Sequence, residues 1–180
     1  MFAQALTEIV RRLEDARTLH LLDQYALIGG LAVAAWGVPR ATHDLDFAVA
    51  LGAADPAALS RSLNARFQTG EDDDPLRGVF QTTVTIEGVS IPIQLILLPA
   101  AWNAIIFQRI EQLHVFGCEV PVVSWQSLIL LKLYAGGPQD FLDAQHILAL
   151  REPSQAEKQV VTTLADRVGL SDAWRTLINL

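Results

Sequence analysis

The chain has 180 residues, of which 51% are hydrophobic, so it can bury a globular core and is not a disordered protein. Thirteen Lys and Arg residues against 20 Asp and Glu residues give a formal net charge of −7, which disfavours non-specific binding to nucleic acid. A single cysteine, Cys118, excludes an intramolecular disulfide and a cysteine-based zinc site.

In the N-terminal half, apolar spacing and turn residues predict alternating helices and strands. Leu6, Ile9 and Leu13 recur at helical spacing, and a buried strand is expected to stop at Gly29-Gly30. The predicted elements are an amphipathic helix over 1–17, a strand over 25–28, a short helix over 31–36, a strand over 44–51 and a helix over 55–67.

The C-terminal half predicts a β-hairpin followed mainly by helices. Gly88 separates two strands, and Pro92 is expected to place the second strand at a sheet edge or to make its first part irregular. The uncharged run 88–108 contains prolines and polar residues, so a strand, a turn and a helix explain it better than a membrane span. The predicted elements are strands over 79–87 and 89–98, a helix over 100–113, a short strand region over 115–123, helices over 124–136 and 138–150, and one or two helices over 154–180.

This order of elements predicts an α/β or α+β fold with a helical C-terminal part. Neither an internal repeat nor a low-complexity linker divides the chain, so we expect one domain over residues 1–180, with a core at about 20–123 and a helical part at about 124–180. The first 17 residues carry several charges and lack the apolar core of a signal peptide, so a cytoplasmic location and no membrane partner are expected.

The segment 27–49 carries the strongest chemical signal. Gly29-Gly30 follows a predicted strand, and two glycines let the backbone approach a phosphate where side chains would clash. Asp44 and Asp46 flank Leu45, and residues two apart on a strand point to the same face. A carboxylate pair beside a phosphate cradle suits Mg²⁺ and the transfer of a nucleotide group. By itself, a Gly-Gly pair is more often a plain turn, and an Asp-x-Asp pair is more often a strand end beside solvent. Together, in this order and at this spacing, they favour the functional interpretation.

A second signal lies in the apolar helix around Lys132. An unpaired lysine would be costly to bury there, so either its stem follows an apolar face with the amine in water, or the amine meets a phosphate or a carboxylate. Asp140, Asp143 and His146 share a face of the next helix, which could indicate a metal site. For Asp143 we favour the simpler interpretation that an acid near a helix N-terminus complements the helix dipole.

The run GGLAVAAWG-x-x-R-A-T-x-D-L-D, which begins at Gly29, resembles the nucleotidyltransferase superfamily and, within it, the AbiEii-type toxin group of minimal nucleotidyltransferases. The segment LILLKLYAGGPQDFLDAQHIL, residues 128–148, resembles the lysine-bearing helix of that group and the aspartate on its next helix. The resemblance covers about residues 25–150. It implies a minimal nucleotidyltransferase core with a mixed sheet and a helical C-terminal part.

The resemblance also implies roles for the residues of the first motif. Gly29 and Gly30 would contact the triphosphate of an NTP, and Asp44 and Asp46 would be catalytic residues that hold Mg²⁺. Leu31 stands where many members have a serine that contacts phosphate, but the backbone N–H groups remain available.

Four further residues receive roles by the same resemblance. Arg40 and Thr42 would support the nucleotide-binding loop that leads to the carboxylates, Lys132 would reach the nucleotide phosphates, and Asp140 would position Lys132 or the attacking group. Arg40 could equally be a solvated loop residue. For Thr42 a local turn hydrogen bond is slightly favoured.

The chain departs from the family pattern at Gln94. Family members usually carry a third acidic residue on a later strand, where it helps to activate the acceptor hydroxyl, and glutamine cannot accept that proton. The acidic run 71–74 could supply a substitute carboxylate, although such a run is more often a solvated loop.

The leading hypothesis is an Mg²⁺-dependent enzyme that moves a nucleoside monophosphate from NTP to a hydroxyl of RNA, such as a tRNA acceptor end, or of a protein. It would resemble the toxin of a toxin–antitoxin pair, with a cognate antitoxin as its partner. The alternative is a catalytically weak or inactive relative that binds a nucleotide or a protein, and Gln94 is its main support. A third hypothesis is an interaction domain in which both motifs are coincidental.

Overall fold

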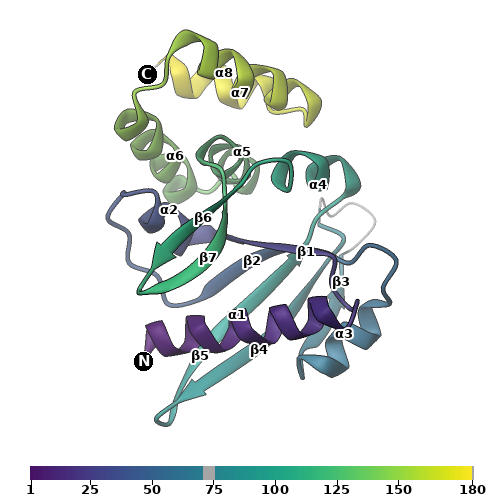
Figure 1. Ribbon diagram of the computed structural model, residues 1–180. Coiled ribbons are helices and arrows are strands. Elements are labelled where there is room, and N and C mark those ends of the chain that lie inside the picture. Colours follow the sequence, from purple (N-terminus) through teal and green to yellow (C-terminus); the bar gives the residue numbers. More distant parts are fainter. Residues whose placement is uncertain (71–75, 180) are drawn as a thin grey trace.

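The computed structural model describes residues 1–70 and 76–179, and within them it forms a mixed seven-stranded sheet (Figure 1). The strands follow the order β3-β4-β5-β2-β1-β7-β6. The pairs β1–β7 and β2–β5 are parallel, and the other neighbouring pairs are antiparallel. The strands are β1 (Gln24–Ile28), β2 (Leu45–Ala50), β3 (Arg66–Thr69), β4 (Gly78–Ile86), β5 (Val89–Leu97), β6 (Ile110–Val115) and β7 (Cys118–Val123). The predicted α/β fold class is confirmed.

Helices cover both faces of the sheet. The amphipathic helix α1 crosses one face, where Leu6, Ile9 and Leu13 are fully buried and Glu14 accepts a hydrogen bond from the Tyr25 hydroxyl (Figure 1). On the opposite face α2 and α5 approach the sheet, and α6, α7 and α8 pack around α5 at one end of the molecule (Figure 1). The helices are α1 (Phe2–Thr18), α2 (Gly29–Ala35), α3 (Pro56–Ser62), α4 (Ala100–Ile106), α5 (Trp125–Ala135), α6 (Pro138–Arg151), α7 (Gln155–Arg167) and α8 (Ser171–Ile178).

Two predicted helices are wrong in their C-terminal parts, because each gives way to a strand. The helix expected over 55–67 ends at Ser62, and the chain turns at Asn64 (φ 48°) so that Arg66–Thr69 becomes the edge strand β3. The helix expected over 100–113 ends at Ile106, and Ile110–Val115 forms β6 beside β7. In both cases pairing with a strand further along the chain overrides the local helical pattern.

Pro92 lies in an internal strand, yet at a point where that strand has only one neighbour. β5 lies between β4 and β2, but β2 pairs with β5 only from Ile93 onward. The missing N–H of Pro92 therefore does not interrupt a ladder on the β2 side. The predicted hairpin at Gly88 is confirmed, with positive φ at Glu87 and Gly88 as a tight two-residue turn requires.

Among the described residues, no helix combines the length and the apolar character that crossing a bilayer requires. The prediction that the run 88–108 is not a membrane helix agrees with its division between β5 and α4.

Candidate functional site

The sheet topology places the glycine pair directly beside the second carboxylate. β1 and β2 are antiparallel, and Ile28 at the end of β1 is paired with Asp46 near the start of β2. Gly29 follows Ile28 and begins α2 with a φ of +67°. The two motifs, which lie about fifteen residues apart in the sequence, thus meet at one end of the central strands.

Neither glycine could carry a side chain without disturbing this arrangement. A Cβ on Gly29 would lie 2.1 Å from Asp46 Oδ2, and one on Gly30 would lie 3.0 Å from Thr42 Oγ1. The absence of both side chains lets the start of α2 approach Asp46 and Thr42 closely.

Asp44 lies just before the strand rather than in it, because β2 begins at Leu45. Thr42 Oγ1 donates a hydrogen bond of 2.8 Å to Asp44 Oδ1 and lies 3.3 Å from the Asp44 carbonyl oxygen. A local hydrogen bond of this kind was the interpretation slightly favoured for Thr42 from the sequence. The bond orients the carboxylate of Asp44.

Lys132 on α5 is buried among carboxylates. Its Nζ lies 2.7 Å from Asp140 Oδ1 and 2.9 Å from Asp143 Oδ2, and its side chain is only 9% exposed. Of the two alternatives for this lysine, the structure therefore shows the amine meeting carboxylates rather than bulk water.

Asp143 has a larger structural role than a complement to the helix dipole. Its side chain is 1% exposed and lies between two cations, Lys132 and Arg40, whose Nε is 3.3 Å from Asp143 Oδ1. Gln139 Nε2 donates a further hydrogen bond of 3.0 Å to the same carboxylate. Asp143 thereby connects the loop that carries Arg40 and Thr42 to helices α5 and α6. These contacts go beyond the dipole interaction expected for Asp143, because a buried carboxylate needs such partners.

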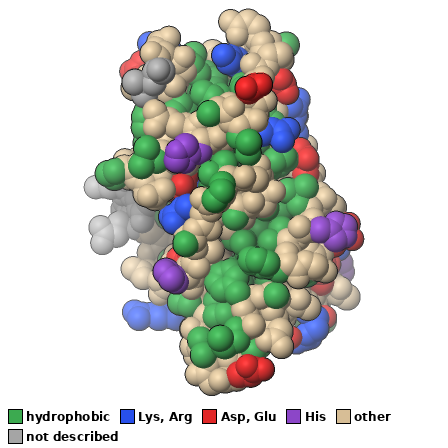
Figure 2. All heavy atoms as spheres, turned by 90° about the vertical axis from the view of Figure 1, so that its left-hand side faces the viewer, with side chains coloured by type: hydrophobic (Ala, Val, Ile, Leu, Met, Phe, Trp, Pro, Cys, Tyr) green, Lys and Arg blue, Asp and Glu red, His purple; other side chains and the backbone are tan. Residues whose placement is uncertain are grey.

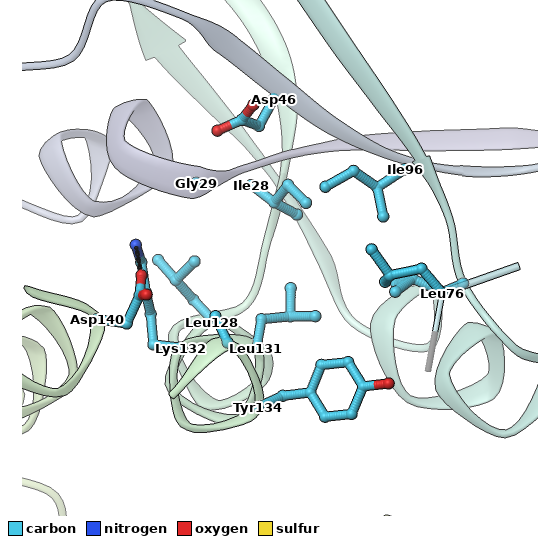
Figure 3. Close-up of a pocket in the computed structure, with 12 residues that line it drawn as sticks. Ile28, Gly29, Asp46, Leu76, Ile96, Leu128, Leu131, Lys132, Tyr134 and Asp140 are labelled. Atoms are coloured by element: carbon cyan, nitrogen blue, oxygen red, sulfur yellow. Dashed lines mark hydrogen bonds and ion pairs between the residues drawn. The ribbon is translucent and has the colours of Figure 1, made fainter. Parts of the chain in front are cut away.

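Asp46, Gly29 and the ion pair of Lys132 with Asp140 meet at one pocket of about 350 Å³ between the sheet and α5 (Figure 3). Gly29, Asp46, Lys132 and Asp140 form its polar part. The rest of its lining is mainly apolar and consists of Ile28, Leu76, Ile96, Leu98, Leu128, Leu131, Tyr134 and Ala135.

Burial and neighbouring charges together set the pKa values of Asp46 and Lys132. Burial, together with the neighbouring charge of Asp44, raises the pKa of Asp46 to about 6, although Lys132 partly offsets this. Burial also acts to lower the pKa of Lys132, but its hydrogen bonds to Asp140 and Asp143 prevail and the pKa is raised. Lys132 is therefore a cation at neutral pH, while Asp46 is a carboxylate that gains from a positively charged ligand.

The raised pKa of Asp46 predicts a pH-dependent change in stability. Unfolding returns the pKa from about 6 to 3.8, so the unfolded chain binds fewer protons between these values and wild-type stability falls as pH rises through this window. Asp46→Asn removes the penalty and should raise the unfolding free energy at pH 7 by up to about 3 kcal/mol, with the difference disappearing towards pH 4. Urea denaturation across this pH range measures it. Lower stability of Asp46→Asn at pH 7 would contradict the prediction.

Gln94 lies directly beside Asp46, as their positions in the parallel pair of β2 and β5 are opposite each other. It therefore occupies the place where a third carboxylate would stand next to the pair. The acidic run 71–74 lies outside the described residues. His146 is exposed on α6, and among the described residues no group of three or more His, Cys, Asp or Glu side chains is placed to hold a metal ion.

A scan against protein-family models and a search of curated proteins both find no match for this chain. Solved structures do resemble it. An antigenic nucleotidyltransferase-like protein from Paracoccidioides brasiliensis matches with a TM-score of 0.51 and 18% identity over 94% of this chain and 91% of that one. ANT(2″)-Ia, solved in complex with adenylyl-2″-tobramycin, matches with a TM-score of 0.51 and 17% identity over 93% of this chain and 97% of that one. The chain therefore has a nucleotidyltransferase-like fold.

Proposed function

We propose that this protein transfers a nucleoside monophosphate from an NTP to a hydroxyl group. The observation that carries the proposal is that Gly29, Asp46, Lys132 and Asp140 line one pocket, with Asp44 two residues before Asp46 and Gly30 next to Gly29. A nucleotidyltransferase-like fold and a neighbour solved with an adenylylated small molecule support the same reaction. A shared fold by itself leaves the chemistry open, so the proposal rests on the site.

The donor set of the site fits Mg²⁺. Asp44 and Asp46 offer two hard oxygen ligands, and Mg²⁺ typically takes one or two carboxylates and completes its shell with water and substrate phosphates. Bound there, the ion would neutralise the two carboxylates and the triphosphate and so stabilise the charge that develops during transfer. The raised pKa of Asp46 supports this assignment, because a cation would relieve its unfavourable burial.

The residues of the chain would bind and orient the reactants. The two glycines bring the backbone at the start of α2 close to Asp46, where its N–H groups would meet the triphosphate, and Lys132 supplies a positive charge held in place by Asp140 and Asp143. The acceptor oxygen would form a bond to the α-phosphorus as the bond to the bridging oxygen breaks. Pyrophosphate would leave, and the hydroxyl proton would pass to water, since Gln94 cannot accept it.

The proposal extends to the acceptor and to a toxin role, and both of these rest on the resemblance of the sequence motifs to the AbiEii-type toxin group. Candidate acceptors are RNA, including a tRNA acceptor end, and a protein side chain, and the expected partner is a cognate antitoxin. On the face that Figure 2 shows, Lys and Arg side chains are scattered among acidic and apolar ones and form no broad basic patch. This distribution and the net charge of −7 favour a protein acceptor or a locally held RNA end over long RNA contacts.

A second candidate function is nucleotide or protein binding with little or no catalysis. The neutral side chain of Gln94 beside Asp46 favours it, because an amide at that position cannot take the acceptor proton.

Calorimetry with each of the four NTPs, with and without Mg²⁺, tests the site. We expect binding that depends on Mg²⁺ and is lost in Asp44→Ala/Asp46→Ala. The matched control is Asp15→Ala/Asp172→Ala, which removes the same charge from two exposed side chains, 61% and 94% accessible, and should leave binding unchanged. Absence of NTP binding by the wild type would refute the proposal.

A further inference from the structure

We propose that Gly137 is a positioning residue for phosphate binding, because its missing side chain lets Asp140 turn away from the start of α6 and hold Lys132 at the pocket. This inference rests on the proposed function, in which Lys132 meets the triphosphate. It starts from a difference between the first turns of two consecutive helices, α6 and α7.

Helix α7 begins with a capping box. Ser154 precedes the helix, and Glu157 is its third residue. Ser154 Oγ accepts a hydrogen bond of 3.3 Å from the N–H of Glu157, and Glu157 Oε2 accepts one of 2.9 Å from the N–H of Ser154. The acidic side chain of this first turn therefore satisfies an N–H group at the N-terminus of its own helix.

Helix α6 uses the equivalent acidic residue differently. Gly137 precedes this helix and Asp140 is its third residue, so they occupy the positions that Ser154 and Glu157 occupy in α7. Glycine has no side chain with which to cap, and Asp140 Oδ1 accepts a hydrogen bond of 2.7 Å from Lys132 Nζ on α5. Figure 3 shows these two side chains facing each other at one end of the pocket. The first turn of α6 thus holds a cation on another helix.

Glycine at position 137 leaves free the space that the carboxylate of Asp140 needs. A Cβ on Gly137 would lie 2.9 Å from Asp140 Oδ2, which is closer than two such atoms pack. The backbone gives no reason for a glycine, because its φ of −72° is one that any residue adopts. The atom in the way is the end of a side chain, so a larger residue would displace the carboxylate rather than the helix.

Displacing Asp140 would draw the amine of Lys132 away from the pocket. Its Nζ lies between two carboxylates, 2.7 Å from Asp140 Oδ1 and 2.9 Å from Asp143 Oδ2. Asp140 lines the pocket, whereas Asp143 is almost completely buried. With Asp140 turned aside, Asp143 becomes the dominant partner of the amine, and less positive charge faces a phosphate in the pocket. Gly137 therefore acts on the nucleotide through Asp140 and Lys132.

Two substitutions of Gly137 separate binding from stability. Gly137→Ser adds a good helix cap, so the urea midpoint should equal or exceed that of the wild type, whereas Gly137→Ala adds a poor cap and should lower it. Both add the Cβ that displaces Asp140. Both should therefore weaken Mg²⁺-dependent NTP binding in calorimetry by about tenfold, the loss expected for one charge-assisted hydrogen bond.

Ser154→Gly is the matched control, because it removes the cap of α7 and should lower the urea midpoint without changing NTP binding. If Gly137→Ser bound NTP within about twofold of the wild type, the inference would be overturned and the proposed function would stand.

A double-mutant cycle tests whether Gly137 acts through Asp140. Asp140→Ala should weaken NTP binding by itself. In that background Gly137→Ser should change the dissociation constant by less than about twofold, because the carboxylate that it would displace is gone. An equal loss in both backgrounds would overturn the inference.

The ligand-free chain provides a readout that does not depend on the nucleotide. The chain has two lysines, Lys132 and Lys158, so NMR spectra of their nitrogen-labelled side chains contain two signals to assign. Gly137→Ser should shift the Lys132 Nζ signal in the wild-type background but not in Asp140→Ala, and the Lys158 signal should stay in place in both. An unchanged Lys132 signal would overturn the inference. If the wild type binds no NTP, the proposed function fails, and these spectra still decide whether Gly137 positions Asp140 against Lys132.

Discussion

Replacing Gly29 with alanine is expected to abolish Mg²⁺-dependent NTP binding and to destabilise the fold by about 2–4 kcal/mol. The new Cβ would lie 2.1 Å from Asp46 Oδ2 and 2.9 Å from Asp46 Cβ, so the carboxylate and its strand must move. The φ of +67° at Gly29 adds backbone strain for any L-residue with a side chain. Urea denaturation measures the stability, and calorimetry measures the binding.

Gly169→Ala is the matched control, because it separates backbone strain from the displacement of Asp46. Gly169 has a φ of +73°, and no atom lies within 4 Å of the position that a Cβ would take. We expect it to lose only about 1 kcal/mol of stability and to keep full NTP binding. If Gly29→Ala behaved like Gly169→Ala, the close approach of α2 to Asp46 would be irrelevant to the site.

Removing the carboxylate of Asp143 is expected to cost about 3–5 kcal/mol of stability. Asp143→Ala leaves Lys132 and Arg40 without their shared partner, and the side chain of Lys132 is only 9% exposed. Burial acts to raise the pKa of Asp143, but hydrogen bonds from Lys132 and Gln139 hold it below the usual value, so the carboxylate is ionised at neutral pH. Its removal therefore deprives Lys132 and Arg40 of a negatively charged partner. Chemical denaturation at pH 7 provides the measurement.

Asp140→Ala is the control within the same cluster. The side chain of Asp140 is 27% exposed against 1% for Asp143, so water can replace much of its contribution, and we expect a loss of about 1 kcal/mol. Lys132→Met/Asp143→Leu should recover more than half of the stability lost in Asp143→Ala, because it removes the buried cation with the buried carboxylate, and the charges left behind, Arg40 and Asp140, are 30% and 27% exposed to water. A loss in Asp143→Ala no larger than in Asp140→Ala would show that the buried contacts contribute little.

The half-buried carboxylate of Asp46 and the buried carboxylate of Asp143 differ in a way that suits different tasks. The pKa of Asp46 is raised, chiefly by burial, whereas that of Asp143 is lowered by its cationic partners despite burial. Asp143 is thus neutralised within the protein, while Asp46 has Lys132 only as a more distant compensating charge. This difference supports Asp46 as a ligand for an added cation and Asp143 as a residue that positions Lys132 and Arg40.

Local spacing and residue type in the sequence were enough to single out Gly29, Asp46 and Lys132, which the structure places at one pocket. Asp44 and Asp46 are two residues apart, and the glycine pair follows a strand, so short-range geometry already indicated a carboxylate pair and a close backbone approach. The apolar surroundings of Lys132 likewise indicated that its amine needs a partner. The α/β class followed from the order of elements, which depends on periodicity within each segment.

Tertiary structure decided the features that depend on partners far apart in the chain. Arg40 and Asp143 are 103 positions apart, so no local pattern could show that one neutralises the other. β3 and β6 form only because a neighbouring strand supplies their hydrogen bonds, and Gln94 meets Asp46 only through the register of β2 and β5. The sequence by itself determined which residues could perform the chemistry, through spacing and side-chain type. Burial and strand pairing depend on contacts between residues far apart in the chain. They decided which of these residues form ion pairs and where the pocket lies.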